Sequence, residues 1–117
     1  MRIVFIGAVE FSLRALEHSL DINADIAEVC TLKESKFNCD HIDLASLSEE
    51  RGLPWYYVAY FDSLDCRDWI QQKSPDVIFC FGWSKLLMYY LLSLAPLGVV
   101  GFHPVALPAN RGLHPLV

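Results

Sequence analysis

The chain opens with Arg2-Ile3-Val4-Phe5-Ile6, an unbroken run of β-branched and aromatic residues, and Gly7 closes it. Such a run is typical of a strand that is buried on both faces of a parallel sheet. The segment that follows, Glu10–Leu20, repeats apolar residues near helical spacing, as an amphipathic helix does. A buried strand followed by an amphipathic helix is the first half of a βαβ unit, so this pair predicts an α/β fold.

The same alternation of strand and helix patterns continues along the chain. Further strands are predicted over Ile26–Leu32, Pro54–Val58, Val77–Phe81 and Val99–Phe102, and further helices over Asp43–Arg51, Ser63–Lys73 and Lys85–Leu94, with Asp62 as an N-cap and Gly52 as a terminator. Strands that alternate with helices build parallel βαβ units. We therefore predict one domain, residues 1–117, with a Rossmann-like, doubly wound and mostly parallel sheet.

The composition is that of a globular protein with an acidic balance. Hydrophobic residues make up 54% and charged residues 20% of the chain, which supplies enough apolar material for a core. The net charge is −5, and the nine basic residues are scattered rather than gathered into a run that would neutralise a phosphate backbone. We therefore expect no nucleic-acid partner, although two cations are enough to hold a small phosphate-bearing substrate.

The cysteines and the apolar tracts help to predict where in the cell the protein is found. The four cysteines form no Cys-x-x-Cys pair and show no zinc-finger spacing with histidine, and Cys30 and Cys80 fall inside apolar runs. We expect reduced thiols and no metal. The longest apolar tract, Leu86–Val100, is interrupted and shorter than the ~20 residues that a membrane span needs. We predict a soluble cytoplasmic protein with no membrane partner, and a homo-oligomer is compatible with the sequence.

Three segments follow predicted strands at their carboxyl ends, where doubly wound sheets bind ligands. The first, Gly7–Glu10, lacks the second and third glycines of a dinucleotide-binding fingerprint, which argues against a nucleotide-dependent oxidoreductase. The second, Phe81–Leu87, combines a glycine that lets a flat ligand approach the backbone with Trp83 as stacking surface. An ordinary turn with a core tryptophan explains this second segment equally well.

The third segment, Phe102–Gly112, contains the best candidate for catalysis. His103 follows a predicted strand in a loop stiffened by prolines, and the near-neutral pKa of histidine suits proton transfer. A lone histidine is more often structural, so these residues alone leave both interpretations open. His18 and His41 stand in helix-like polar settings that give them no role, and His114 is ambiguous.

This third segment also carries a resemblance to a known family. The formyltransferases that use 10-formyltetrahydrofolate contain an Asn-x-His-x-Ser-Leu-Leu-Pro-x-x-Arg-Gly loop, which is similar to Gly101-Phe102-His103-Pro104-Val105-Ala106-Leu107-Pro108-Ala109-Asn110-Arg111-Gly112. The opening Arg2–Phe11 resembles the family's first strand and turn, and Ser74–Ile78 with Phe81-Gly82-Trp83 resembles its fourth strand and pterin-contacting loop. The resemblance covers essentially the whole chain.

The resemblance implies a chemistry and a set of site residues. The family transfers a formyl group from 10-formyltetrahydrofolate to a primary amine, and no metal is implied. His103 would stabilise the oxyanion or shuttle the proton. The pterin pocket would be lined by Phe81, Gly82, Trp83, Lys85, Leu86 and Leu87, and the acceptor would meet Asn110 and Arg111.

The chain departs from the family pattern in two places. Gly101 replaces the family's catalytic asparagine, and the loss of one oxyanion donor costs ~10²–10³ in rate. Asn110 lies in the same loop and is a candidate replacement donor. The family's catalytic aspartate falls beyond Val117. We therefore expect the N-terminal part of a truncated catalytic domain, inactive by itself.

Three functional hypotheses follow from these features. The first is an N-formyltransferase that acts on a small-molecule amine of the nucleotide-linked amino-sugar type, because the acidic balance disfavours tRNA. The second keeps this chemistry and has a methionyl-tRNA-like acceptor. The third is a non-catalytic folate- or nucleotide-binding domain, which the glycine at position 101 favours.

Overall fold

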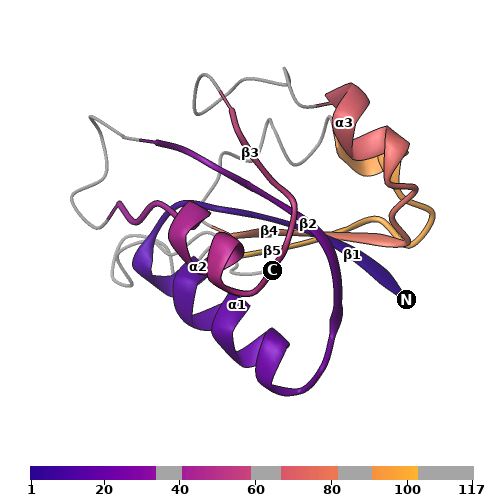
Figure 1. Cartoon of the computed structure of the whole chain (residues 1–117). Helices are drawn as coiled ribbons and strands as arrows, with labels where there is room; N and C mark the ends of the chain where they lie inside the picture. Colours follow the sequence, from indigo (N-terminus) through magenta and orange to yellow (C-terminus); the bar gives the residue numbers. More distant parts are fainter. Residues whose placement is uncertain (34–40, 59–66, 82–90, 103–117) are drawn as a thin grey trace, which may run out of the picture.

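The computed structural model describes residues 1–33, 41–58, 67–81 and 91–102. The elements within these ranges are, in chain order, β1 (Arg2–Gly7), α1 (Glu10–Asp21), β2 (Asp25–Thr31), α2 (Ala45–Glu50), β3 (Trp55–Tyr57), α3 (Arg67–Gln72), β4 (Val77–Phe81), the 3-10 helix η1 (Leu92–Leu94) and β5 (Val99–Phe102). The strands form one sheet in the order β3-β2-β1-β4-β5, and all neighbouring strands are parallel. The predicted α/β class with a doubly wound parallel sheet is confirmed (Figure 1).

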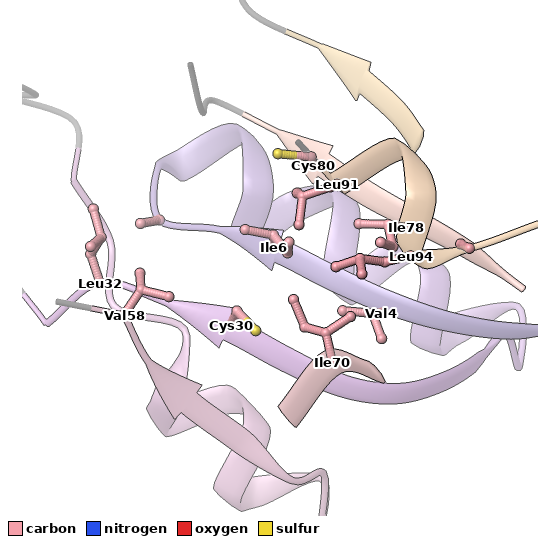
Figure 2. Close-up of a cluster of buried hydrophobic side chains, with 12 residues drawn as sticks. Val4, Ile6, Cys30, Leu32, Val58, Ile70, Ile78, Cys80, Leu91 and Leu94 are labelled. Carbon is pink, nitrogen blue, oxygen red and sulfur yellow. The ribbon is translucent and has the colours of Figure 1, made fainter. Parts of the chain in front are cut away.

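Alternate side chains of the strands build a hydrophobic core on each face of the sheet. The face covered by α1 and α2 carries one cluster, the α1 layer, and the opposite face, covered by α3 and η1, carries the α3 layer (Figure 1). The buried residues of the α1 layer are Ile3, Phe5, Leu16, Ile26, Val29, Leu44 and Val77. Those of the α3 layer are Val4, Ile6, Ala8, Cys30, Leu32, Val58, Ile70, Ile78, Cys80, Leu91, Leu94 and Ala95 (Figure 2). Burial on both faces explains why the strand sequences are continuously apolar.

The pairing of β1 with β2 contains an irregularity that changes which residues face which layer. Ile3 pairs with Ile26, but the next residue, Val4, pairs with Glu28, so one residue of β2 is skipped. A bulge of this kind shifts the side-chain alternation by one position. Ile26, which precedes the bulge, therefore joins the α1 layer. Beyond the bulge, the residue of β2 that pairs with Val4 faces the α3 layer. The bulge thus places an acidic residue, Glu28, on an apolar face.

The start of α2 differs from the prediction because of a side-chain hydrogen bond. Asp43, predicted as the first helical residue, lies outside the helix, and its Oδ1 accepts a hydrogen bond from the Ala45 amide at 2.8 Å. This is the local bond by which aspartate favours a turn over a helix. The hydroxyl of Tyr57 donates to Asp43 Oδ2 at 2.6 Å, and this bond raises the pKa of Tyr57. Gly52 has φ of +70° beyond the helix, which confirms it as the terminator.

Three other predicted elements are longer than what the structure describes. β3 has three residues, although the flanking Pro54 carbonyl and Val58 amide still bond to β2, at 2.9 Å each. α3 occupies the second half of the predicted helix Ser63–Lys73, whose start, with Asp62, lies outside the described residues. The helix predicted over Lys85–Leu94 is described only at its end, which forms η1. Within the described ranges, none of the helices combines the length and the hydropathy required to cross a bilayer.

Candidate functional site

The carboxyl edge of the sheet brings the ends of three strands to one level. Gly7 at the end of β1 pairs with Phe81 at the end of β4, and Phe81 pairs with Phe102 at the end of β5. The three segments that the sequence nominated as ligand sites therefore leave the sheet from three adjacent strands. Chain order reverses between β1 and β4, and ligands of doubly wound sheets bind at such a switch point.

Most of the predicted site residues lie outside the described part of the chain. These are the predicted catalytic His103, the predicted pterin contacts Gly82, Trp83, Lys85, Leu86 and Leu87, and the predicted acceptor contacts Asn110 and Arg111. The structure does fix where their segments begin, because Phe81 and Phe102 are paired neighbours. Parallel strands lie about 4.8 Å apart, so the predicted pterin segment and the predicted catalytic segment start from adjacent points.

Phe81 is the predicted site residue that the structure describes. Its ring is half-buried and meets Phe5 at 5.4 Å and Phe79 at 5.9 Å between ring centroids. The ring of Phe11, at the start of α1, stands edge-on to it at 5.7 Å and is 43% exposed. The carboxyl edge thus presents an aromatic surface next to the switch point, of the kind that a flat heterocycle can cover.

A buried serine ties the first turn of α1 to the end of β4. The Ser12 hydroxyl donates to the Phe81 carbonyl at 3.3 Å and accepts from the Val9 amide at 3.3 Å. The second bond satisfies the Val9 amide at the N-terminus of α1, as the N3 side chain of a capping box does. Gly7 makes this close packing feasible, because a Cβ there would stand 2.4 Å from the Ser12 Cβ. The point where the predicted pterin segment begins is therefore held by α1.

We expect Ser12→Ala to lower the free energy of unfolding by about 1–2 kcal/mol, because it leaves two buried backbone groups without this hydroxyl. Urea unfolding of the complete protein measures the effect. Ser19→Ala is the matched control, since the Ser19 hydroxyl bonds the Ala15 carbonyl of its own helix, at 2.8 Å. If the free energy of unfolding fell no more in the Ser12 variant than in the control, the proposed hydrogen-bonded link between α1 and β4 would be contradicted.

His41 belongs to this edge although its sequence context gave it no role. It forms an isolated antiparallel bridge with Val9, and the neighbouring Ile42 amide donates to the Ala8 carbonyl at 2.9 Å. The Nε2 atom of His41 lies 2.8 Å from the Leu32 carbonyl, which can only accept, so Nε2 carries a proton and donates this bond. Sequence alone offered no signal for this position, because the contact joins segments about thirty residues apart.

Other features bear on the chemistry of the edge. Gly101, which stands where the family has asparagine, lies in β5 opposite Cys80 and is exposed. Among the residues that the structure describes, no group of three or more His, Cys, Asp or Glu side chains is arranged to hold a metal ion. The groups described at this edge include aromatic rings, the Ser12 hydroxyl, His41 and backbone amides and carbonyls.

Comparison with known proteins supports one family. No family model matches the chain. The chain is 28% identical over 120 aligned residues to the methionyl-tRNA formyltransferases of Thermotoga sp. (strain RQ2), Thermotoga maritima and Thermotoga neapolitana. Each alignment covers 99% of this chain, and the chain spans 38% of the length of these relatives. The resemblance predicted from the loop after β5 is confirmed.

The same comparison overturns the predicted partner. The acceptor named for these relatives is methionyl-tRNA, a nucleic acid. The prediction of a small-molecule amine, possibly carried on a sugar nucleotide, with no nucleic-acid partner is therefore wrong. That prediction used the net charge of −5, which describes these 117 residues alone. Phosphate contacts depend on where a few cations stand and not on the sum of charges.

Proposed function

We propose that this chain, similar to formyltransferases along 99% of its length, is the N-terminal part, residues 1–117, of a formyltransferase catalytic domain. The reaction moves the formyl group of 10-formyltetrahydrofolate to a primary amine. The observation that carries this proposal is the pairing of Phe81 with Phe102, which starts the pterin segment and the His103 segment side by side. A bound co-substrate and a catalytic side chain must be held this close for group transfer.

The chemistry assigns a role to His103. The amine nitrogen attacks the formyl carbon, the bond from that carbon to the folate nitrogen breaks, and the proton that the amine loses ends on that folate nitrogen. Negative charge develops on the formyl oxygen in the tetrahedral intermediate, and a hydrogen-bond donor aimed at that oxygen lowers the barrier. His103 is proposed to donate to this oxygen or to carry the proton, with Asn110 as the second donor in place of the side chain that Gly101 lacks.

The pterin ring is proposed to lie against the end of β4. Phe81, Gly82, Trp83, Lys85, Leu86 and Leu87 would hold it. The aromatic surface formed by Phe81 and Phe11 supports this assignment, as does the Ser12 hydroxyl that fixes the strand end. The backbone groups that follow β4 would then be positioned to hydrogen-bond the edge of the pterin ring, since a rigid strand end orients the segment that comes after it.

The acceptor is proposed to be the amine of an aminoacyl-tRNA, as the names of the relatives indicate, with Asn110 and Arg111 among its contacts. Each tRNA phosphate that a cation neutralises releases counterions, so binding weakens as salt rises. A formylation assay on the complete protein, with 10-formyltetrahydrofolate and methionyl-tRNA, is expected to yield formyl-methionyl-tRNA with a KM that increases with salt. Free methionine, which lacks the phosphates, is the control. Turnover of neither substrate, together with no folate binding, would contradict the proposal.

A folate-binding protein without turnover is the second candidate, and Gly101 favours it. This glycine provides no side-chain donor for the oxyanion, and the loss of one such donor lowers the rate ~10²–10³-fold. Calorimetry on the complete protein separates the two functions. Folate binding without any formyl transfer would support the binding protein, whereas binding with turnover supports the enzyme.

A further inference from the structure

Glu28 is a buried acid without a hydrogen-bond partner. The side chain is 0% exposed, and neither carboxylate oxygen is bonded to any of the residues that the structure describes. Buried polar groups are nearly always hydrogen-bonded, and each exception calls for a physical explanation. A charged carboxylate in this position is especially costly, because it has lost its water shell and gained no donor.

The position of Glu28 is fixed by the sheet. The bulge between β1 and β2 pairs it with Val4, which belongs to the α3 layer together with Cys30 and Ile70 (Figure 2). A slip of one residue would turn the carboxyl to the other face, but it would also turn every apolar residue of β2 away from its layer. The carboxyl is therefore held between the sheet and α3.

The charged groups around Glu28 stand at the amino edge of the sheet and have other contacts. The Arg2 Nε donates to the Lys73 carbonyl at 2.8 Å, and the Arg2 amide donates to Asp76 Oδ2 at 2.8 Å. The Lys73 ammonium lies 5.8 Å from the centre of the Trp69 ring. On α3 itself, Arg67 and Asp68 are exposed, and on β2 Asp25 is exposed. β3 contributes Tyr56, whose ring packs on Trp69.

Burial decides the charge state of this group. It raises the pKa of Glu28 from 4.5 to about 7, and the nearby cations Lys73 and Arg2 lower it only in part. The neutral acid is the form that fits the apolar layer, since its desolvation costs much less than that of the carboxylate. The carboxylate would fit only if the side chain reached water or one of these two cations.

We propose that Glu28 makes the docking of α3 on the sheet sensitive to protons. The neutral carboxyl packs beneath the helix, and α3 stays closed over Val4, with its own Ile70 in the α3 layer. When the proton leaves, the carboxylate draws toward water and toward the cations at the edge, and α3 opens more often. The device lies on the face opposite α1 and does not depend on the formyl-transfer chemistry.

The direction of the pH effect follows from the two pKa values. An acid whose pKa is higher in the folded than in the unfolded state stabilises the fold fully below its ordinary value of 4.5. This contribution falls as the pH rises from 4.5 and is gone above about 7. The equilibrium for closing is therefore expected to weaken on the order of a hundredfold across this window.

Hydrogen exchange on the complete protein tests this proposal. The protection factors of the α3 amides, which are corrected for the intrinsic effect of pH, are measured between pH 5 and 8. They are expected to fall across the window in the wild type and to stay level in Glu28→Gln, whose amide cannot ionise. Glu17→Gln, which alters an exposed glutamate of α1, is the matched control and should behave as the wild type.

Two results would overturn the proposal. One is a wild-type fall that persists unchanged in Glu28→Gln. The other is a carboxyl titration of Glu28, followed by carbon NMR in the wild type, with its midpoint at the ordinary value near 4.5. The NMR titration needs no substitution, so it decides the question even if the glutamine variant does not fold.

Discussion

Replacing His103 by alanine is expected to lower kcat for formyl transfer by about 10²–10⁴-fold, the usual contribution of a positioned acid–base group. Folate binding should be retained, because the proposed pterin contacts belong to the segment after β4. The expectation rests on the paired ends of β4 and β5, which start the two segments next to each other. Steady-state kinetics of the complete protein, together with folate calorimetry, separates the loss of chemistry from a loss of binding.

Two further histidines serve as controls for this prediction. His18 is exposed on α1, and its alanine variant should keep full turnover. His41 lies at the carboxyl edge beside β1, next to Val9, and its alanine variant is expected to affect turnover less than His103→Ala. Full turnover in His103→Ala would overturn the assignment. A larger loss in His41→Ala would move the chemistry to the β1 side of the edge.

The sequence predicted the parts of the fold that buried strands determine. β4 and β5 have the predicted bounds, and β1 extends by Gly7 beyond the predicted strand Arg2–Ile6, because runs such as Val77–Phe81 are apolar at every position. Helix ends were less predictable. The start of α2 depends on Asp43, which favours a turn by binding the Ala45 amide.

Non-local pairing explains what the sequence did not show. The strand over Ile26–Leu32 was predicted, but the bulge that buries Glu28 depends on how β2 meets β1. His41 reaches the site edge by pairing with Val9, which no local pattern indicates. The partner was predicted from the net charge and from the scatter of the basic residues along the sequence, and neither says where cations stand on the folded surface. The common cause is that local propensity fixes elements, whereas contacts between distant segments fix the site.

Substituting Gly7 by alanine is expected to cost about 3 kcal/mol in the free energy of unfolding, at the upper end of what overpacking of a close-packed interior costs. The added Cβ would stand 2.4 Å from the Ser12 Cβ and 2.5 Å from its hydroxyl. The Ser12 Cβ is fixed to the helix backbone, so α1 itself must move away from the strand end. That movement would also break the bond from Ser12 to the Phe81 carbonyl, so formyl transfer should fall with stability.

Two variants distinguish this contact from a general effect of losing a glycine. Gly52 has a φ of +70°, and among the described residues nothing lies within 4 Å of a Cβ added there, so Gly52→Ala should cost only about 1–2 kcal/mol of left-handed backbone strain. Adding Ser12→Gly to Gly7→Ala removes the atom that the new Cβ meets. Urea unfolding should then show the double variant less destabilised than the sum of the single variants by about 1 kcal/mol or more. Additive losses would mean that Gly7 is required for its backbone freedom, and that the packing of α1 on the strand end does not position the site.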